Sequence, residues 1–73
     1  MNLQAATQIV DHAREFGLDP HTSYVTLDGE QHHYIEFPNS LSFSNASAAI
    51  MYIEAVITER QLYRQALRIE NVA

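Results

Sequence analysis

Cysteine and lysine are both missing from this chain, and each absence narrows what the protein can be. Without cysteine there are no disulfides and no thiolate zinc sites, so the 73 residues depend on one small hydrophobic core. A core of that size rarely supplies more than about 3–5 kcal/mol of net stability without reinforcement. We therefore expect a single domain over residues 1–73 that associates with another molecule.

Without lysine, only four arginines oppose nine acidic residues, and the net charge is −5. Nucleic-acid-binding proteins need basic groups to neutralise phosphates, so we expect no nucleic-acid partner. The longest apolar stretch, residues 48–57, contains Glu54 and has about half the length of a bilayer-spanning helix, so we expect no membrane partner. The first residues lack the pattern of a secretory signal. Together with the missing cysteine, this indicates a cytoplasmic location.

Motifs that carry chemistry are also scarce. With two glycines there is no phosphate-cradling loop. A serine, histidine and aspartate set such as Ser40, His33 and Asp28 can be named, but none of the three lies in a glycine-flanked elbow that would expose a nucleophile. We therefore predict a protein that is not an enzyme, with no catalytic residues and no cofactor.

Four histidines raise the question of a metal site, since imidazole is the commonest protein metal ligand: His12, His21, His32 and His33. Adjacent residues of a strand point to opposite faces, so His32 and His33 cannot hold one ion together. His12 has no ligand one turn away on its own helix face. The spacing favours ordinary surface or sheet histidines, and we expect no metal.

Hydrophobic spacing divides the chain into five segments. The expected elements are a helix over residues 2–17, strands over 24–27, 32–37 and 41–43, and a long helix over 46–71. Gly17 marks the end of the first helix, because glycine adopts the left-handed conformation that closes one. The expected fold is a small αβββα domain of the α+β class: an antiparallel hairpin or meander sheet with an N-terminal helix and a long C-terminal helix.

The hairpin presents a conflict between its turn and its apolar pattern. Asp28-Gly29 favours a two-residue turn, which would place Val25 opposite His32 and Leu27 opposite Glu30. A slip of one residue moves every side chain to the other face, and we expect the apolar pattern to prevail through a loop of three or five residues. The expected core face then carries Val25, Leu27, Ile35 and Phe37. The expected outer face carries Tyr24, Thr26, Tyr34 and Glu36.

The long helix is more apolar than one neighbouring layer requires. Between Ile50 and Ile57 only Glu54 is charged, whereas a helix that meets a single layer needs an apolar stripe of about 100°. Either the first helix or a second copy must cover the remaining surface. The helix also outreaches so small a domain, which favours a homodimer paired through it.

A line at spacings of three and four continues this helix from apolar to cationic residues. It runs through Ile50, Ile53, Ile57, Arg60, Arg64 and Arg68, with Tyr63 and Leu67 on the adjacent face. Guanidinium groups bind carboxylates and phosphates bidentately, so one interpretation is a recognition strip. The other is a solvated polar face near the helix end, and we favour it because surface ion pairs contribute little.

These features lead to two hypotheses. The first is a protein-binding module: a homodimer paired through residues 50–68 that binds or inhibits a partner protein stoichiometrically, presenting an acidic surface. Small acidic proteins of this kind are frequent among phage and mobile-element accessory proteins that block host machinery. A second surface of Tyr24, His32, Tyr34 and Glu36 contributes to binding, since tyrosine is enriched in interfaces. The alternative is a binder of a small anionic ligand or nucleotide at Arg60, Arg64 and Arg68.

Overall fold

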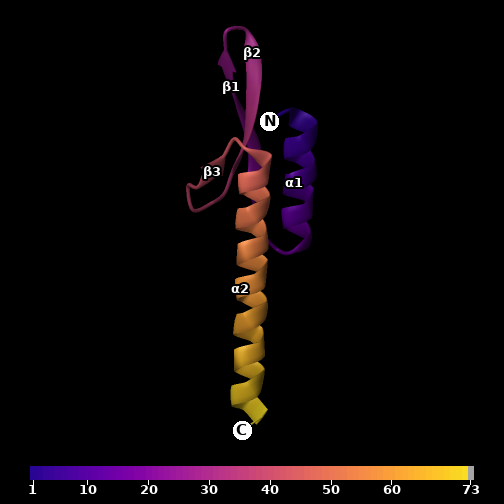
Figure 1. Cartoon of the computed structure of the whole chain (residues 1–73), viewed down its shortest axis with the longest axis vertical. Coiled ribbons are helices and arrows are strands. Elements are labelled where there is room, and N and C mark those ends of the chain that lie inside the picture. Colours follow the sequence, from indigo (N-terminus) through magenta and orange to yellow (C-terminus); the bar gives the residue numbers. More distant parts are fainter. Residues whose placement is uncertain (73) are drawn as a thin grey trace.

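The computed structural model describes the backbone of residues 1–72 and the side chains of residues 1–68. The five expected elements occur in the expected order: α1 (Leu3–Glu15), β1 (His21–Leu27), β2 (Glu30–Glu36), β3 (Ser42–Phe43) and α2 (Ala46–Val72). The strands form one antiparallel sheet in the order β1-β2-β3, which confirms the predicted α+β fold. The molecule measures 61 × 19 × 17 Å, because α2 extends far past the other elements (Figure 1).

Helix α1 lies within the predicted residues 2–17, starting one residue later and ending two residues earlier. The side chain of Asn2 accepts a hydrogen bond from a backbone N–H of the first turn at 2.8 Å. At the other end Gly17 adopts a φ of +85°, and its N–H donates to the carbonyl of Arg14 at 3.0 Å. The N–H of Leu18 donates to the carbonyl of Ala13 at 3.2 Å, completing a Schellman motif. This closure turns the chain toward the sheet.

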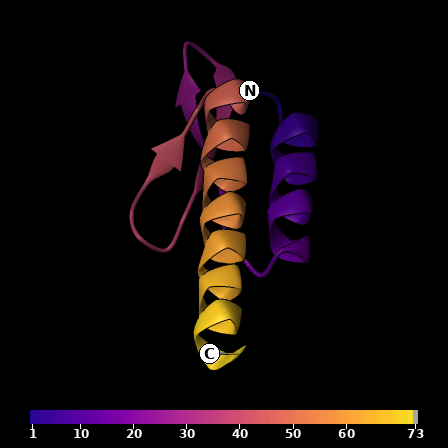
Figure 2. The same cartoon turned by 60° about the horizontal axis from the view of Figure 1, so that its bottom comes forward.

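The core lies where the two helices meet the base of the hairpin. The helices lie side by side and run in the same direction (Figure 2). Nine apolar side chains of the described residues are buried there: Ala6, Ile9, Val10, Ala13, Ile35, Phe37, Ala49, Ile53 and Ile57. Phe37 also packs edge-on against Tyr52, with 4.8 Å between ring centroids, and Tyr52 stacks on Phe43 at 5.2 Å. These aromatic contacts attach β3 to α2.

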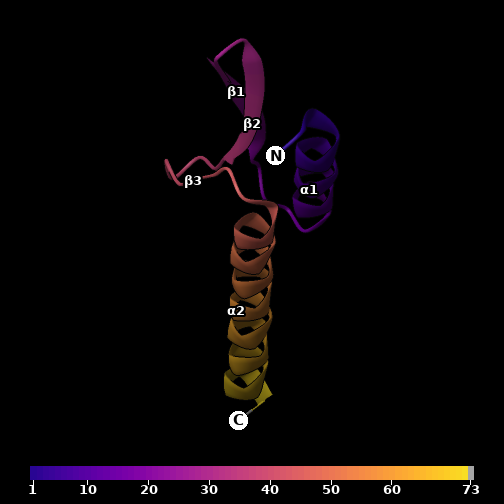
Figure 3. The same ribbon diagram turned by 45° about the horizontal axis from the view of Figure 1, so that its top comes forward.

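The hairpin register differs from the prediction. Leu27 pairs with Glu30 and Val25 with His32 across a two-residue turn, so the expected loop of three or five residues is wrong. Ile35 and Phe37 do enter the core, and Tyr34 lies on the opposite face, as expected. In β1 the two faces are exchanged relative to the prediction. Val25 and Leu27 lie on the outer face, whereas Tyr24 and Thr26 lie on the face of Ile35. Figure 3 shows that the hairpin tip extends away from both helices.

Two physical reasons explain this register. Asp28 and Gly29 adopt φ values of +52° and +80°, the left-handed pair of a type I′ turn, whose twist matches that of the flanking strands. The competing register would bury little additional apolar surface. The tip of the hairpin projects beyond the ends of α1 and α2 (Figure 1), so a side chain near the tip gains little burial on either face of the sheet. Local turn chemistry therefore decides the register.

Candidate functional site

Two of the isoleucines predicted for an interface belong to the core of the chain itself. Ile53 is fully buried and Ile57 is 8 % exposed, both within the cluster formed with α1 and the sheet. Ile50 lies at the margin and remains 44 % exposed. The excess apolar surface of this helix is therefore smaller near Ile53 than its sequence indicates. The surface of α2 that remains available to a partner lies further along the helix.

Beyond Ile57 the same face of α2 becomes cationic. At 100° per residue, Arg60, Arg64 and Arg68 continue the line that Ile53 and Ile57 begin. We call these three arginines the arginine face, and residues 58–72 of α2 the distal arm. The arm extends past α1 because that helix ends near Arg60. The arginine face is thus aligned with the core, and its three side chains are exposed.

Arg60 connects this face to the end of α1. Its Nη1 donates a hydrogen bond to the carbonyl of Phe16 at 3.3 Å. That carbonyl belongs to the C-terminal end of α1, where the helix dipole carries partial negative charge. Arg64 and Arg68 are exposed on the following turns. Among the side chains of residues 1–68, no carboxylate oxygen lies within salt-bridge distance of an arginine, so none of these arginines is neutralised by a described carboxylate.

Two hollows flank Arg60 and Arg64. One, of about 60 Å³, is lined by Phe16, Ile57 and Gln61 as well as the two arginines. The other, of about 390 Å³, lies on the opposite side of the arginines. It is lined by Val56, Glu59 and Tyr63 together with the same two arginines. Both combine guanidinium groups with apolar or aromatic surface. An acidic group bound there would gain charge-assisted hydrogen bonds beside a partly apolar wall.

Apolar side chains are also exposed along the distal arm. Leu62 is 61 %, Tyr63 66 % and Leu67 40 % exposed. Leu67 lies beside the arginine face, whereas Leu62 lies on the opposite side of the helix. The predicted interface residues beyond Ile57 therefore lie together on the part of α2 that extends past α1. Ile53 and Ile57 instead belong to the core.

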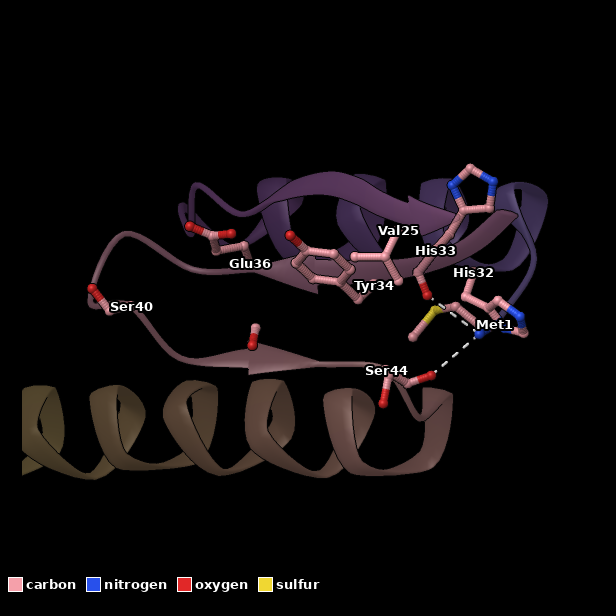
Figure 4. Close-up of a pocket in the computed structure, with 9 residues that line it drawn as sticks. Met1, Val25, His32, His33, Tyr34, Glu36, Ser40 and Ser44 are labelled. Carbon is pink, nitrogen blue, oxygen red and sulfur yellow. Dashed lines mark hydrogen bonds between the residues drawn. The ribbon is translucent and has the colours of Figure 1, made fainter. Parts of the chain in front are cut away.

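The predicted second surface is divided by the hairpin register. His32, Tyr34 and Glu36 share the outer face of β2, where they line a hollow of about 580 Å³ (Figure 4). Tyr24 lies on the other face, with its ring 5.8 Å from that of His33. Val25 takes the place expected for Tyr24 beside this hollow.

The first residue closes one end of this hollow. The backbone nitrogen of Met1 donates to the carbonyls of His33 at 3.3 Å and Ser44 at 3.2 Å, and the N–H of His33 donates to the carbonyl of Met1 at 3.2 Å (Figure 4). Ser44 and two further serines lie around the rim. Within the described residues, none of these serines makes a hydrogen bond to His32 or Glu36, so the contact that would activate a nucleophile is missing there.

The histidines do not converge in the part of the chain that the structure describes. No group of three or more histidine, aspartate or glutamate side chains is placed to hold a metal ion there. His12 faces Glu54 and packs edge-on against Phe16, with 5.3 Å between ring centroids. Over the same residues, no helix is both long enough and apolar enough to span a bilayer.

Three features of the site are not evident from sequence spacing: the contact of Arg60 with Phe16, the position of Met1, and the outward placement of Val25. The first two join residues more than 30 apart in the chain. The third was indicated by Asp28-Gly29, because this dipeptide favours the two-residue turn that places Val25 on the outer face. Comparisons with protein-family models, with curated proteins and with solved structures found no match for this chain.

Proposed function

We propose that this protein is a non-enzymatic protein-binding module that captures a partner protein stoichiometrically on the distal arm of α2. The observation that carries the proposal is the position of the arginine face. It continues the line of the buried Ile53 and Ile57, but it lies beyond the end of α1. A helix face aligned with a core is normally apolar and covered. Here it is cationic and open, which suits a partner with an acidic surface.

The length of the arm supports the same proposal. Helix α2 continues from Arg60 to Val72, about 18 Å at 1.5 Å per residue, and the described side chains of this stretch, residues 60–68, are all exposed. Leu67 and the hollow at Phe16 offer apolar contact beside the guanidinium groups. Interfaces combine apolar area with such directed polar groups, and arginine is enriched among the residues that dominate binding energy.

Pairing of two copies through α2 stays a prediction, and the arginines count against this face as the contact. A two-fold axis that pairs the arms antiparallel places the arginine faces opposite each other, because both copies present the same side chains. Like charges at close range oppose association unless carboxylates intervene. We therefore assign the arginine face to a partner of opposite charge. A cytoplasmic setting in a phage or mobile element also stays a prediction from size and composition.

A matched pair of substitutions tests the proposal. Arg64→Gln and Gln65→Glu change the net charge by the same amount, but the two residues lie about 100° apart on the helix. Loss of a charge-assisted hydrogen bond of about 1.5–3 kcal/mol should weaken partner binding about tenfold or more in Arg64→Gln. Gln65→Glu should bind nearly as the parent does. Binding partners would be isolated from lysate, purified, and measured by calorimetry for affinity and stoichiometry.

The proposal fails if the isolated partner binds Arg64→Gln and the parent equally. It also fails if the complex turns over a substrate or departs from a fixed stoichiometry. Salt gives an independent check, because binding that depends on exposed charges weakens as ionic strength rises.

A second candidate function is binding of a small anionic ligand or nucleotide. It is favoured by one observation: Arg60 and Arg64 line both hollows, and Tyr63 lines the larger one, where its ring offers a stacking surface. Under this hypothesis pyrophosphate or ATP raises the melting temperature of the parent in a concentration-dependent way. The shift should disappear in Arg64→Ala. No shift at millimolar ligand would contradict it.

A further inference from the structure

The outer edge of β1 carries backbone groups without partners. The sheet order is β1-β2-β3, so β1 has β2 on one side only. In a hairpin with a two-residue turn the flanking residues, here Leu27 and Glu30, exchange hydrogen bonds, and the pattern alternates from there. The N–H and C=O groups of Thr22, Tyr24 and Thr26 therefore point outward. Within the described residues, no hydrogen bond reaches these groups.

This edge lacks the devices that usually protect an exposed strand. Natural edge strands carry lysine, proline, inward-pointing charges or bulges that prevent pairing with another chain. From residue 22 to residue 27 there is neither proline nor any charged side chain, and the pairing with β2 is regular throughout. Threonine, tyrosine and valine in this segment all favour extended structure. The edge is thus suited to accept another strand.

Exposed apolar side chains lie on both faces of the same strand. Val25 is 46 % and Leu27 57 % exposed on the outer face, and Tyr24 is 55 % exposed on the other. The type I′ turn at Asp28 holds Val25 and Leu27 away from the core, although the sequence pattern would place them inside it. Apolar residues that the fold leaves uncovered, next to unpaired backbone, indicate an interface.

We propose that a second copy of this chain pairs antiparallel with β1, joining the two sheets into one of six strands. The occupant is a second copy because the segment is self-compatible: it has no charge to repel itself, and a two-fold axis at Val25 aligns Tyr24 with Thr26 of the partner subunit in hydrogen-bonded pairs. Val25 then faces its own counterpart in a non-hydrogen-bonded pair, with Leu27 at the diagonal position. Such neighbours are close enough to pack.

This dimer goes beyond the proposed function and does not depend on it. It uses the hairpin end of the molecule, whereas the distal arm lies at the opposite end of the long axis (Figure 1). Both arginine faces would therefore stay free for partner proteins, and the dimer would present two of them. The test below uses the purified chain alone, so its failure would leave capture by the arginine face untouched.

Matched charge substitutions provide the first test. Val25→Lys and Leu62→Lys each place a lysine at an exposed apolar position, 46 % and 61 % exposed respectively, on opposite ends of the molecule. Val25→Lys brings two like charges opposite each other across the proposed pair and should weaken dimerisation about tenfold or more. Leu62→Lys should dimerise as the parent does. Analytical ultracentrifugation up to millimolar protein measures the oligomeric state, and circular dichroism checks that each variant is folded.

Cross-linking provides the second test and fixes the register. The chain has no cysteine, so one introduced cysteine reports on one position. Val25→Cys should form an intermolecular disulfide rapidly under mild oxidation, because opposed Cβ atoms in a non-hydrogen-bonded pair are about 4.5–5.5 Å apart. Met51→Cys, at a position that is 72 % exposed on α2, should cross-link no faster than random collision.

The expected result is a concentration-dependent dimer that Val25→Lys dissociates, Leu62→Lys leaves intact and Val25→Cys traps. A parent that stays monomeric at millimolar concentration overturns the proposal. Dissociation by Leu62→Lys but not by Val25→Lys would instead place the contact on α2, and equal cross-linking of Val25→Cys and Met51→Cys would exclude the β1 pair.

Discussion

Truncation of Ile53 provides a direct measurement of how the stability of this chain is distributed along α2. The side chain has no exposed surface and lies in the cluster formed by both helices and β2. Ile53→Ala should lose about 2–5 kcal/mol, through lost burial and the cavity left behind. A core of this size supplies about 3–5 kcal/mol in total. The loss is therefore comparable with the total stability, and we expect a substantial unfolded fraction of this variant.

The smaller change Ile53→Val keeps the measurement quantitative. Loss of one buried methylene should destabilise the fold by about 0.5–1.5 kcal/mol. With a urea m-value of about 1 kcal/mol/M for a small domain, the unfolding midpoint should fall by about 1 M without a change in slope. Equilibrium urea unfolding followed by circular dichroism gives both values.

Leu62→Ala is the matched control on the same helix. Leu62 is 61 % exposed, so a larger truncation there should change the free energy of unfolding by no more than about 0.5 kcal/mol. Measurements at low protein concentration report on the single chain. The reasoning would be refuted if Ile53→Val had no effect, or if Leu62→Ala destabilised the chain as much as Ile53→Val at every concentration.

Three further substitutions test local features of the fold. Gly29→Ala should destabilise the chain by about 1–2 kcal/mol in thermal unfolding, because Gly29 has a φ of +80° that disfavours a Cβ; an unchanged melting temperature would contradict the turn assignment. Asn45→Ala should lose about 1 kcal/mol, because the Asn45 side chain accepts a hydrogen bond of 3.1 Å from the first turn of α2, and Asn45→Asp serves as the control that keeps the cap. Tyr52→Phe removes only an exposed hydrogen bond of 3.1 Å from Asn39 and should cost less than about 1 kcal/mol, whereas Tyr52→Ala should lose clearly more; equal effects would show that the aromatic contacts contribute little.

The elements themselves could be predicted from the sequence because their signals are local. Spacings of three and four define α1 and α2, and the structure begins and ends them close to the expected residues. Gly17 marks the end of α1 through contacts within a few residues. The face of β2 was also predictable, because Ile35 and Phe37 are the residues of that strand that reach the core.

The candidate site was predictable only in part. The arginine spacing placed Arg60, Arg64 and Arg68 on one face, since helix geometry alone fixes that relation. Their relation to the core required the structure, because it depends on where α1 ends against α2. The position of that end also explains why Ile53 and Ile57 are covered by the chain itself, whereas Arg64 on the same line of α2 is exposed.

The sequence by itself determined the order of elements, the approximate ends of the helices and the turn at Asp28-Gly29, because hydrogen bonds and steric limits between near neighbours decide these features. Only the tertiary structure decided which surface remains open. The two helices cover only the base of the hairpin, and α1 ends near Arg60, so the tip of the hairpin and the distal arm of α2 extend from opposite ends of the core. Which side chains are covered depends on the lengths and packing of elements far apart in the chain, and local sequence patterns do not predict this.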